Sequence, residues 1–407
     1  MTYRDAIDWL FATQMFGIKL GLDGPRHLLK ESLAYPSNRT KVIHVAGTNG
    51  KGSTCAMIDS VARAGGMRTG LFTSPHLIDY RERIKVSGME IPEEDCAELL
   101  TDLRGICERM ETHPTFFEIT LALAMRWFRM RECELIILET GMGGRMDATT
   151  AVPADVCVIT PIGMDHMQWL GDTIELIAAE KAGIFLEGVP VVCSAQEPGA
   201  KFVLQKEANE KRCPIEFIEQ PLTGYPIALE GPHQARNAAL AVAALHQLGM
   251  RLDYDIVHHG LSKVRWPGRF ERFPAEGRPE IILDGAHNPH AAEVLAETWR
   301  QQFGEAKATL LFSAVSSKDI SGILSVLAPL AERIHLCPVD TPRAVSASDL
   351  AASLPENTPP HLTFETFQEA LDASLKHAEP ILIAGSLYLV GEAKGWLEGR
   401  SFQSCTQ

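Results

Sequence analysis

Short apolar runs of β-forming residues alternate with longer stretches of helical periodicity, and this alternation limits the fold more than any other feature. Parallel strands need a crossover of a dozen or more residues, usually a helix, so the pattern predicts a parallel α/β fold. The clearest predicted strands in the first part of the chain are 41–46, 69–73, 135–139 and 156–160. The predicted helices there include 51–64, 93–111, 117–130 and 173–182.

A second alternating series begins near Pro279. Its predicted strands are 281–283, 309–312, 334–336, 362–366 and 381–384, and its predicted helices are 290–302, 320–331, 346–353 and 367–377. The segment 265–278 between the two series is rich in proline, glycine and charge, which favours a linker. Because 407 residues exceed what one hydrophobic core usually holds, we predict domains over 1–264 and 279–407.

Charge, cysteine usage and hydropathy exclude several classes of protein. The formal net charge of −14 argues against a general nucleic-acid binder, which needs a basic surface. Nine cysteines are scattered from Cys55 to Cys405 without a C-x-x-C pair, which favours free thiols in a reducing compartment. The first ten residues carry charges unlike a signal peptide, and no stretch approaches the roughly 20 apolar residues of a membrane span. We therefore expect a cytoplasmic protein without nucleic-acid or membrane partners.

A glycine-rich loop follows the first predicted strand and precedes a predicted helix. Residues 47–54 read G-T-N-G-K-G-S-T, and such glycines let backbone N–H groups surround phosphate oxygens. Lys51 can reach the β- and γ-phosphates, and the hydroxyl of Ser53 or Thr54 can face Mg²⁺. The spacing departs from G-x-x-x-x-G-K-[ST], so a plain glycine-rich turn is the alternative. The predicted ATP contacts here are Thr48, Asn49, Gly50, Lys51, Gly52 and Ser53.

Three oxygen or nitrogen donors stand at or just beyond the ends of successive predicted strands: Ser74, Glu139 and His166. The carboxyl ends of parallel strands form the ligand crevice of an open sheet, and a carboxylate there can hold Mg²⁺. A histidine beside oxygen donors suggests a second metal of similar hardness. Taken singly, each residue could instead be a cap, an ion pair or a structural histidine. Lys181, late in a predicted helix, could simply complement the helix dipole.

Six motifs occur in one order along the chain: T-N-G-K-G-S at 48–53, T-S-P-H-L at 73–77, E-T-G-M-G-G-R-M-D at 139–147, D-H at 165–166, E-K-A-G-I at 180–184 and D-G-A-H-N-P at 284–289. Together they resemble the folylpolyglutamate synthase/dihydrofolate synthase family, a branch of the Mur-ligase superfamily, over about residues 7–391. The resemblance implies an N-terminal P-loop ATPase domain of Mur-ligase type that also carries a pterin site. It implies a smaller C-terminal Rossmann-like α/β domain on the glutamate side, with ATP and substrates meeting between the two.

The resemblance also implies roles for single residues. Ser74 and Glu139 would hold one Mg²⁺, and His166 with Glu139 a second. Lys181 would be carboxylated on its side chain, which turns a cation into a carboxylate able to assist the second metal. The catalytic residues would be Lys51, Lys181 and His166. Further nucleotide contacts would be Asn237, Arg269, Asp284 and His287, and for Asp284 the alternative is an N-cap of the predicted helix 290–302.

The substrate side rests on weaker matches. Three segments match those that contact the dihydropteroate moiety in bacterial members: Gly17, Ile18, Lys19 and Leu20; Thr115, Phe116, Phe117 and Glu118; and Met146, Asp147 and Ala148. The aromatic residues among them could equally be core. Residues of the C-terminal domain that could receive glutamate are Lys318, Asp319, Arg343 and Ser386. Thr140 and Thr150 depart from the residues common in the family, without removing a predicted ligand.

The activity that the resemblance implies is an ATP-dependent ligation of L-glutamate to dihydropteroate, reduced folates or both. ATP would be the co-substrate, two Mg²⁺ ions would assist, and an acyl phosphate would be the intermediate in a monomeric enzyme. One alternative is another Mur-type ligase that acts on a cell-wall precursor. Another is a P-loop nucleotide switch or kinase, which leaves Lys181 and the second α/β domain unexplained. A third is a non-catalytic homologue, which the full set of predicted ligands disfavours.

Overall fold

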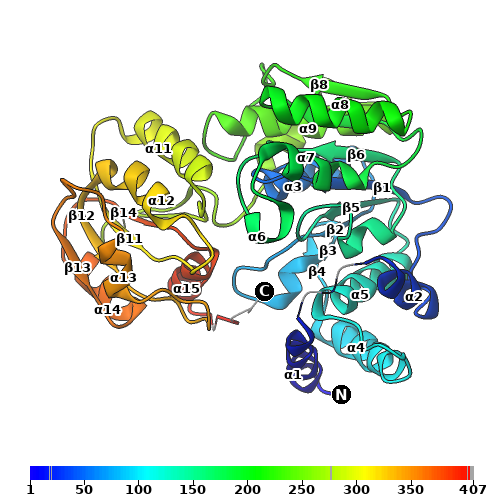
Figure 1. Cartoon of the computed structure of the whole chain (residues 1–407), viewed down its shortest axis with the longest axis horizontal. Helices are drawn as coiled ribbons and strands as arrows, with labels where there is room; N and C mark the ends of the chain where they lie inside the picture. The colour runs from blue at the N-terminus through cyan, green and yellow to red at the C-terminus, as the bar shows by residue number, and fades with distance from the viewer. Residues whose placement is uncertain (18, 20, 276, 401, 404–407) are drawn as a thin grey trace.

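Two separate sheets organise the computed structural model, which describes residues 1–17, 19, 21–275, 277–400 and 402–403 (Figure 1). The N-terminal sheet has eight strands in the order β4-β3-β2-β5-β1-β6-β7-β8. Six of them are parallel, and β3 pairs antiparallel with both β2 and β4. The strands are β1 (Lys41–Ala46), β2 (Thr69–Phe72), β3 (Ile84–Val86), β4 (Met89–Glu90), β5 (Leu135–Glu139), β6 (Val156–Ile159), β7 (Val191–Ser194) and β8 (Ile215–Ile218).

Helices cover both faces of this sheet, as parallel strands require. The helices are α1 (Tyr3–Ala12), α2 (Asp23–Glu31), α3 (Lys51–Ala64), α4 (Glu93–Cys107), α5 (Phe116–Met130), α6 (Met167–Leu170), α7 (Ile174–Lys181), α8 (Pro198–Glu210), α9 (His233–Gln247) and α10 (Tyr254–Lys263). On β1, Ile43 and Val45 join the core formed with α3, α9 and α10, whereas Val42 and Ala46 join the opposite core. Strand β1 therefore carries apolar residues toward both faces of the sheet, interrupted only by His44 after the exposed Lys41, and this pattern made the strand predictable from the sequence.

The C-terminal sheet has six strands in the order β13-β12-β11-β14-β10-β9, all parallel except β9. The strands are β9 (Glu271–Phe273), β10 (Ile281–Asp284), β11 (Ala308–Phe312), β12 (Ala331–Leu336), β13 (His361–Thr363) and β14 (Ile381–Ala384). Its helices are α11 (Pro289–Phe303), α12 (Ile320–Leu327), α13 (Ala347–Ala352), α14 (Phe367–Ser374) and α15 (Leu387–Glu398). The α/β fold class is confirmed. The domain bounds stay a prediction, and β9 lies inside the segment predicted as linker.

Three helix predictions were wrong at their ends, and the helices expected over 93–111 and 367–377 stop at Cys107 and Ser374. The helix expected over 320–331 stops at Leu327, a 3₁₀ turn covers Ala328–Leu330, and β12 begins at Ala331 rather than at residue 334. Pro329 explains the difference, because proline lacks the N–H that continues a helix and clashes with the preceding turn. The chain therefore leaves α12 and enters β12 within one short turn.

Apolar contacts join the two halves of the molecule. Leu77 and Ile78, which follow β2, pack in one buried cluster with Leu283, Ile383 and Val390 of the C-terminal part. The loop after β2 is thus anchored in the core of the second sheet.

The state of the cysteines agrees with the prediction of free thiols. The eight cysteines in the described part of the chain are all free and buried, and Cys405 lies outside it. Within the described residues, none of the helices combines the length and apolarity that crossing a membrane requires.

Candidate active site

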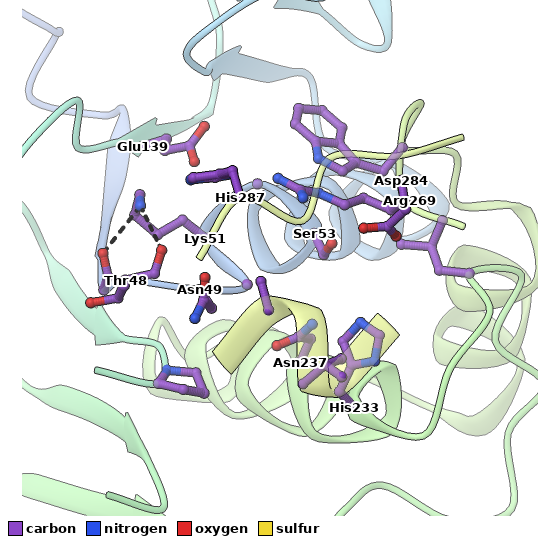
Figure 2. Close-up of a pocket in the computed structure, with 18 of the residues that line it drawn as sticks. Thr48, Asn49, Lys51, Ser53, Glu139, His233, Asn237, Arg269, Asp284 and His287 are labelled. Carbon is purple, nitrogen blue, oxygen red and sulfur yellow. Dashed lines mark hydrogen bonds between the residues drawn. The ribbon is translucent and has the colours of Figure 1, made fainter. Parts of the chain in front are cut away.

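The glycine-rich loop connects β1 to α3, and its backbone conformation depends on glycine. Gly47 has φ +152° and Gly50 has φ +84°, values that residues with a Cβ rarely adopt. A Cβ on Gly50 would lie 2.7 Å from the Oδ1 of Asn237, so glycine permits this close approach of α9 to the loop. Lys51 begins α3, and its Nζ donates to the carbonyl oxygens of Gly47 at 3.1 Å and Thr48 at 3.2 Å (Figure 2).

A cavity of about 1840 Å³ opens beside this loop and is lined by residues from both sheets. The predicted ATP contacts all line it: Thr48, Asn49, Gly50, Lys51, Gly52, Ser53, Asn237, Arg269, Asp284 and His287. The predicted metal ligands Ser74, Glu139 and His166 line it too, as does Lys181. The fold thus gathers into one cavity a set of residues that spans more than 200 positions of the chain.

Asp284 is the last residue of β10, and its side chain connects the segment before β9 to the C-terminal sheet through a hydrogen bond. Its carboxylate accepts hydrogen bonds from the backbone N–H of Phe270 at 2.9 Å and of Ala286 at 2.8 Å. Burial raises the pKa of Asp284, and the nearby guanidinium of Arg269 opposes that rise (Figure 2). The N-cap of α11 is Asn288, whose side chain accepts from Ala291 N–H, so the capping alternative for Asp284 was wrong.

Glu139 and Ser74 meet at the carboxyl ends of β5 and β2. The Glu139 side chain is 4% exposed and accepts a hydrogen bond from the backbone N–H of Ser74 at 3.1 Å. Burial raises the pKa of Glu139, and the ammonium of Lys51 opposes the rise. No group of three His, Cys, Asp or Glu side chains in the described part of the chain stands close enough to hold a metal alone. A single carboxylate beside a hydroxyl and a phosphate loop suits Mg²⁺, which keeps waters and takes phosphate oxygens as further ligands.

His166 lines the cavity and directly precedes α6. Its backbone has φ +53°, which is uncommon for a residue with a Cβ and directs the following turn. Burial lowers the pKa of the ring to about 4, so the imidazole is neutral and can act as a metal ligand.

Lys181 is the last residue of α7 and is buried. Its Nζ donates to the carbonyl oxygen of Gly47 at 2.8 Å, across 134 residues of sequence. Burial and the charge of Lys51 lower the pKa of Lys181 to about 7. Complementing the helix dipole does not account for a side chain that reaches the phosphate loop.

The predicted pterin contacts lie elsewhere, and none of the described ones lines the cavity. Thr115 and Glu118 form a reciprocal capping box at the start of α5, and Phe116 is core. Of the other two segments, Met146 is exposed, Asp147 and Ala148 are buried, and Lys19 donates to His113. Ile18 and Leu20 lie outside the described residues, while Gly17 follows a 3₁₀ turn.

The predicted glutamate contacts also have structural partners. Lys318 Nζ lies 2.7 Å from Asp165 Oδ1 across the two halves of the molecule, and each side chain is 9% exposed. Arg343 donates to the hydroxyl of Tyr388 at 2.8 Å. Ser386 caps α15, and Asp319 caps α12. Their contact with a substrate stays a prediction.

Sequence reasoning missed two residues that line the cavity, His233 and Trp266, and one contact beside it, between Asn288 and Asn49. His233 lies one helical turn before Asn237 on α9, and this i, i+4 spacing was a readable signal. Trp266 packs on the start of α3, where a Cβ on Gly52 would lie 2.7 Å from its ring. Asn288 exchanges side-chain hydrogen bonds with Asn49 of the phosphate loop at 3.1 and 3.4 Å. The last contact joins residues too distant in sequence to be paired from a pattern.

A parallel α/β P-loop domain that shares its nucleotide cavity with a second α/β sheet defines an ATP-dependent ligase of Mur type. Residues 45–220 match the family model of the Mur ligase middle domain, and residues 268–387 match that of the Mur ligase, glutamate ligase domain. Within that class, the chain belongs to the dihydrofolate synthase/folylpolyglutamate synthase family.

Three relatives illustrate the similarity. Dihydrofolate synthase/folylpolyglutamate synthase of Bacillus subtilis is 35% identical in an alignment 431 residues long, gaps included, that covers 96% of this chain and 98% of that protein. The structure of E. coli FolC in complex with DHPP and ADP has a TM-score of 0.86 at 30% identity and covers 97% of this chain and 98% of its own. The structure of a bifunctional folylpolyglutamate synthase/dihydrofolate synthase with Mn, AMPPNP and L-glutamate bound has a TM-score of 0.86 at 31% identity, with the same two coverages.

Proposed function

We propose that this chain joins L-glutamate to both dihydropteroate and reduced folates in a reaction driven by ATP. The observation that carries the proposal is the composition of the cavity. Lys51, Glu139 and Lys181 stand on its N-terminal wall, and Asp284 and His287 face them from the C-terminal sheet. Relatives of the same length whose names include both activities, or whose structures hold ADP, DHPP and L-glutamate, support the choice of substrates.

Activation of the acceptor is the first step. Amide formation from a free carboxylate is unfavourable in water, so the γ-phosphoryl group of ATP passes to the acceptor carboxylate and gives an acyl phosphate and ADP. Phosphoryl transfer is mainly a matter of positioning and neutralising charge. The N–H groups of the glycine loop and the start of α3 hold the phosphates, and Lys51 exchanges its carbonyl partners for phosphate oxygens. On the other wall, Arg269 provides a planar guanidinium for the nucleotide.

Amide formation is the second step. The α-amine of glutamate attacks the acyl carbon, the C–O bond to phosphate breaks, and the amine loses a proton. Contacts that join the two halves, among them Asp165 with Lys318 and Asn49 with Asn288, hold the two walls of the cavity together. Exclusion of water between these walls would protect the intermediate from hydrolysis. The partners that would orient the incoming glutamate are Lys318, Arg343 and Ser386.

Two Mg²⁺ ions fit the donors of the N-terminal wall. Ser74 and Glu139 would hold one, and His166 and Glu139 the other. When bound, the ions supply charge neutralisation at the phosphate oxygens. Carboxylation of Lys181 would add a carboxylate at the phosphate loop, and the lowered pKa of its amine favours that modification because only a neutral amine reacts with CO₂.

Two further parts of the proposal concern the state of the protein. We expect a monomer, because one chain supplies both walls of the cavity. We also expect it to work in the cytoplasm, where the free, buried thiols of the described residues remain reduced.

The test of the proposed function follows ADP release by purified protein with MgATP and glutamate, with dihydropteroate and tetrahydrofolate offered separately. Mass spectrometry identifies the products. A gain of one glutamyl unit on both acceptors is expected. A gain on one acceptor alone would restrict the proposed function to one activity, dihydrofolate synthase for dihydropteroate or folylpolyglutamate synthase for tetrahydrofolate. ADP release without any acceptor, or none with either, would contradict the choice of substrates and favour a ligase that acts on a cell-wall precursor.

A further inference from the structure

Three buried polar side chains form a chain from the middle of β1 to the loop after β5. His44 Nε2 lies 2.7 Å from Thr149 Oγ1, and Thr149 Oγ1 donates to Asp147 Oδ1 at 2.5 Å. The His44 and Thr149 side chains are at most 1% exposed. Because the Thr149 hydroxyl has a single proton and donates it to Asp147, the hydroxyl oxygen accepts from His44. His44 is therefore a neutral ring that carries its proton on Nε2, in line with a pKa that burial lowers to about 3.

The carboxylate of Asp147 closes the loop to which it belongs. Its Oδ1 also accepts from the backbone N–H of Thr149 at 3.0 Å, and its Oδ2 accepts from the N–H of Met142 at 2.8 Å. Both oxygens are thus occupied by the loop 141–149, and Asp147 is not among the residues that line the cavity. The same loop is closed a second time where Thr150 Oγ1 donates to the carbonyl oxygen of Gly144 at 2.7 Å.

The loop 141–149 packs closely against the end of α7. A Cβ on Gly144 would lie 2.6 Å from the carbonyl oxygen of Glu180 and 2.8 Å from that of Lys181. The backbone N–H of Arg145 donates to the Glu180 carbonyl oxygen at 2.9 Å. The loop and the Lys181 backbone are therefore packed so closely that a shift of one requires a shift of the other, and Lys181 Nζ reaches from there to Gly47 of the phosphate loop. On its other side, Gly141, Met142 and Gly143 line the cavity.

We propose that His44 and Thr149 are positioning residues for the ligase reaction. Through Asp147 they hold the loop 141–145 against the end of α7 and so keep Lys181 at the phosphate loop. Neither residue lines the cavity, and the inference rests on the proposed function. Asp147 then acts on the reaction through the loop that it closes. A displacement of about 1 Å at a reacting centre lowers rates by up to about 100-fold. A substitution of Thr149 that lets Lys181 shift is therefore expected to lower kcat.

The decisive variant is Thr149→Val, which keeps the shape of the side chain and removes the hydroxyl. We expect kcat for glutamate addition to fall about tenfold or more, while the KM for ATP changes less than about twofold, because the phosphate loop keeps its own bonds. Thr149→Ser restores the hydroxyl and is expected to return kcat to within about threefold of the wild type. Thr120→Val is the matched control: this buried hydroxyl donates to the carbonyl oxygen of Phe116 inside α5, and its loss is expected to leave kcat unchanged.

Hydrogen exchange gives a readout that does not depend on turnover. In Thr149→Val the amide of Met142 and its neighbours up to residue 145 are expected to exchange faster, and in Thr149→Ser at the wild-type rate. If Thr149→Val does not fold, His44→Phe breaks the same chain at its other end and is measured in the same two ways. A folded variant with wild-type kcat, or with unchanged exchange over 141–145, would overturn the inference. A wild type that adds no glutamate to any acceptor would overturn the proposed function first, before any variant is compared.

Discussion

The ammonium nitrogen of Lys181 lies 2.8 Å from the carbonyl oxygen of Gly47, so the last side chain of α7 contacts the first residue of the phosphate loop. The contact places a buried amine beside the second cation of the site, Lys51, and burial together with the charge of Lys51 lowers the pKa of Lys181 to about 7. An amine in that state is neutral in a large fraction of molecules at pH 8. It can therefore take up CO₂ and become an anion where the structure has a surplus of positive charge.

Replacement of Lys181 by methionine is expected to lower kcat by about 100-fold, because a charged group beside the transferred phosphate is lost. The same variant tests the carboxylation. Wild-type protein in ¹³C-bicarbonate at pH 8 is expected to show one carbamate carbon resonance that Lys181→Met lacks. Lys201→Met, which removes an exposed lysine paired with Glu219, serves as the control for both measurements. A carbamate signal that persists in Lys181→Met would contradict the assignment.

Replacement of Glu139 by glutamine preserves the shape of the side chain and removes the charge that would hold Mg²⁺. We expect the Mg²⁺ concentration for half-maximal ADP release to rise at least about tenfold, with the fold intact. The measurement is a Mg²⁺ titration of turnover at saturating ATP. Glu134→Gln is the control, because Glu134 precedes the same strand at its other end and accepts from the N–H of Arg68. An unchanged Mg²⁺ requirement in Glu139→Gln would remove this residue from the metal site.

The sequence predicted those features that arise from local chemistry. Strand β1 and helix α3 have the bounds that were expected, because an apolar strand, a glycine loop and a helix follow one another without interruption. Glu139 could be placed at the cavity because it closes an apolar strand, and the carboxyl ends of parallel strands meet; its role as a metal ligand stays a prediction. The T-x-x-E spacing of Thr115 and Glu118 was also present in the sequence, and it indicates the capping box that the structure shows.

Contacts between distant segments could not be predicted in the same way. Asp165 and Lys318 are separated by 153 residues, and only the packing of the two sheets brings them together. Nor does any periodicity indicate that His44, in the middle of an apolar strand, would have Thr149 as its partner. Such pairs follow from the tertiary arrangement, which one sequence does not display.

The buried pair of Asp165 and Lys318 is expected to couple the two halves of the molecule. Burial alone would raise the pKa of Asp165, yet Lys318, His166 and His287 hold it below its ordinary value. Lys318→Met leaves the aspartate charge poorly compensated and is expected to destabilise by about 3 kcal/mol. Adding Asp165→Asn is expected to recover part of this loss, which gives a coupling of about 2 kcal/mol in a double-mutant cycle of urea unfolding.

An exposed ion pair supplies the control for that cycle. Arg212 and Glu187 lie 3.1 Å apart with side chains that are 82% and 73% exposed. Their coupling is expected to stay below about 0.5 kcal/mol. Equal couplings for the two pairs, or strict additivity at Asp165 and Lys318, would show that the buried contact does not stabilise the folded protein.

The ionisation of Glu392 on α15 is expected to make the free energy of unfolding depend on pH. Burial, with a smaller contribution from Asp340, raises the pKa of this carboxyl from 4.5 to about 7. Between pH 4.5 and pH 7 the unfolded chain has released this proton while the folded chain retains it, so stability falls as pH rises through that window and the loss is complete above it. Glu392→Gln cannot ionise. We expect its urea midpoint to match the wild type at pH 4.5 and to indicate about 1–2 kcal/mol more stability at pH 8. Glu356→Gln, at an exposed position, is the control, and an equal gain at both pH values would exclude ionisation as the cause.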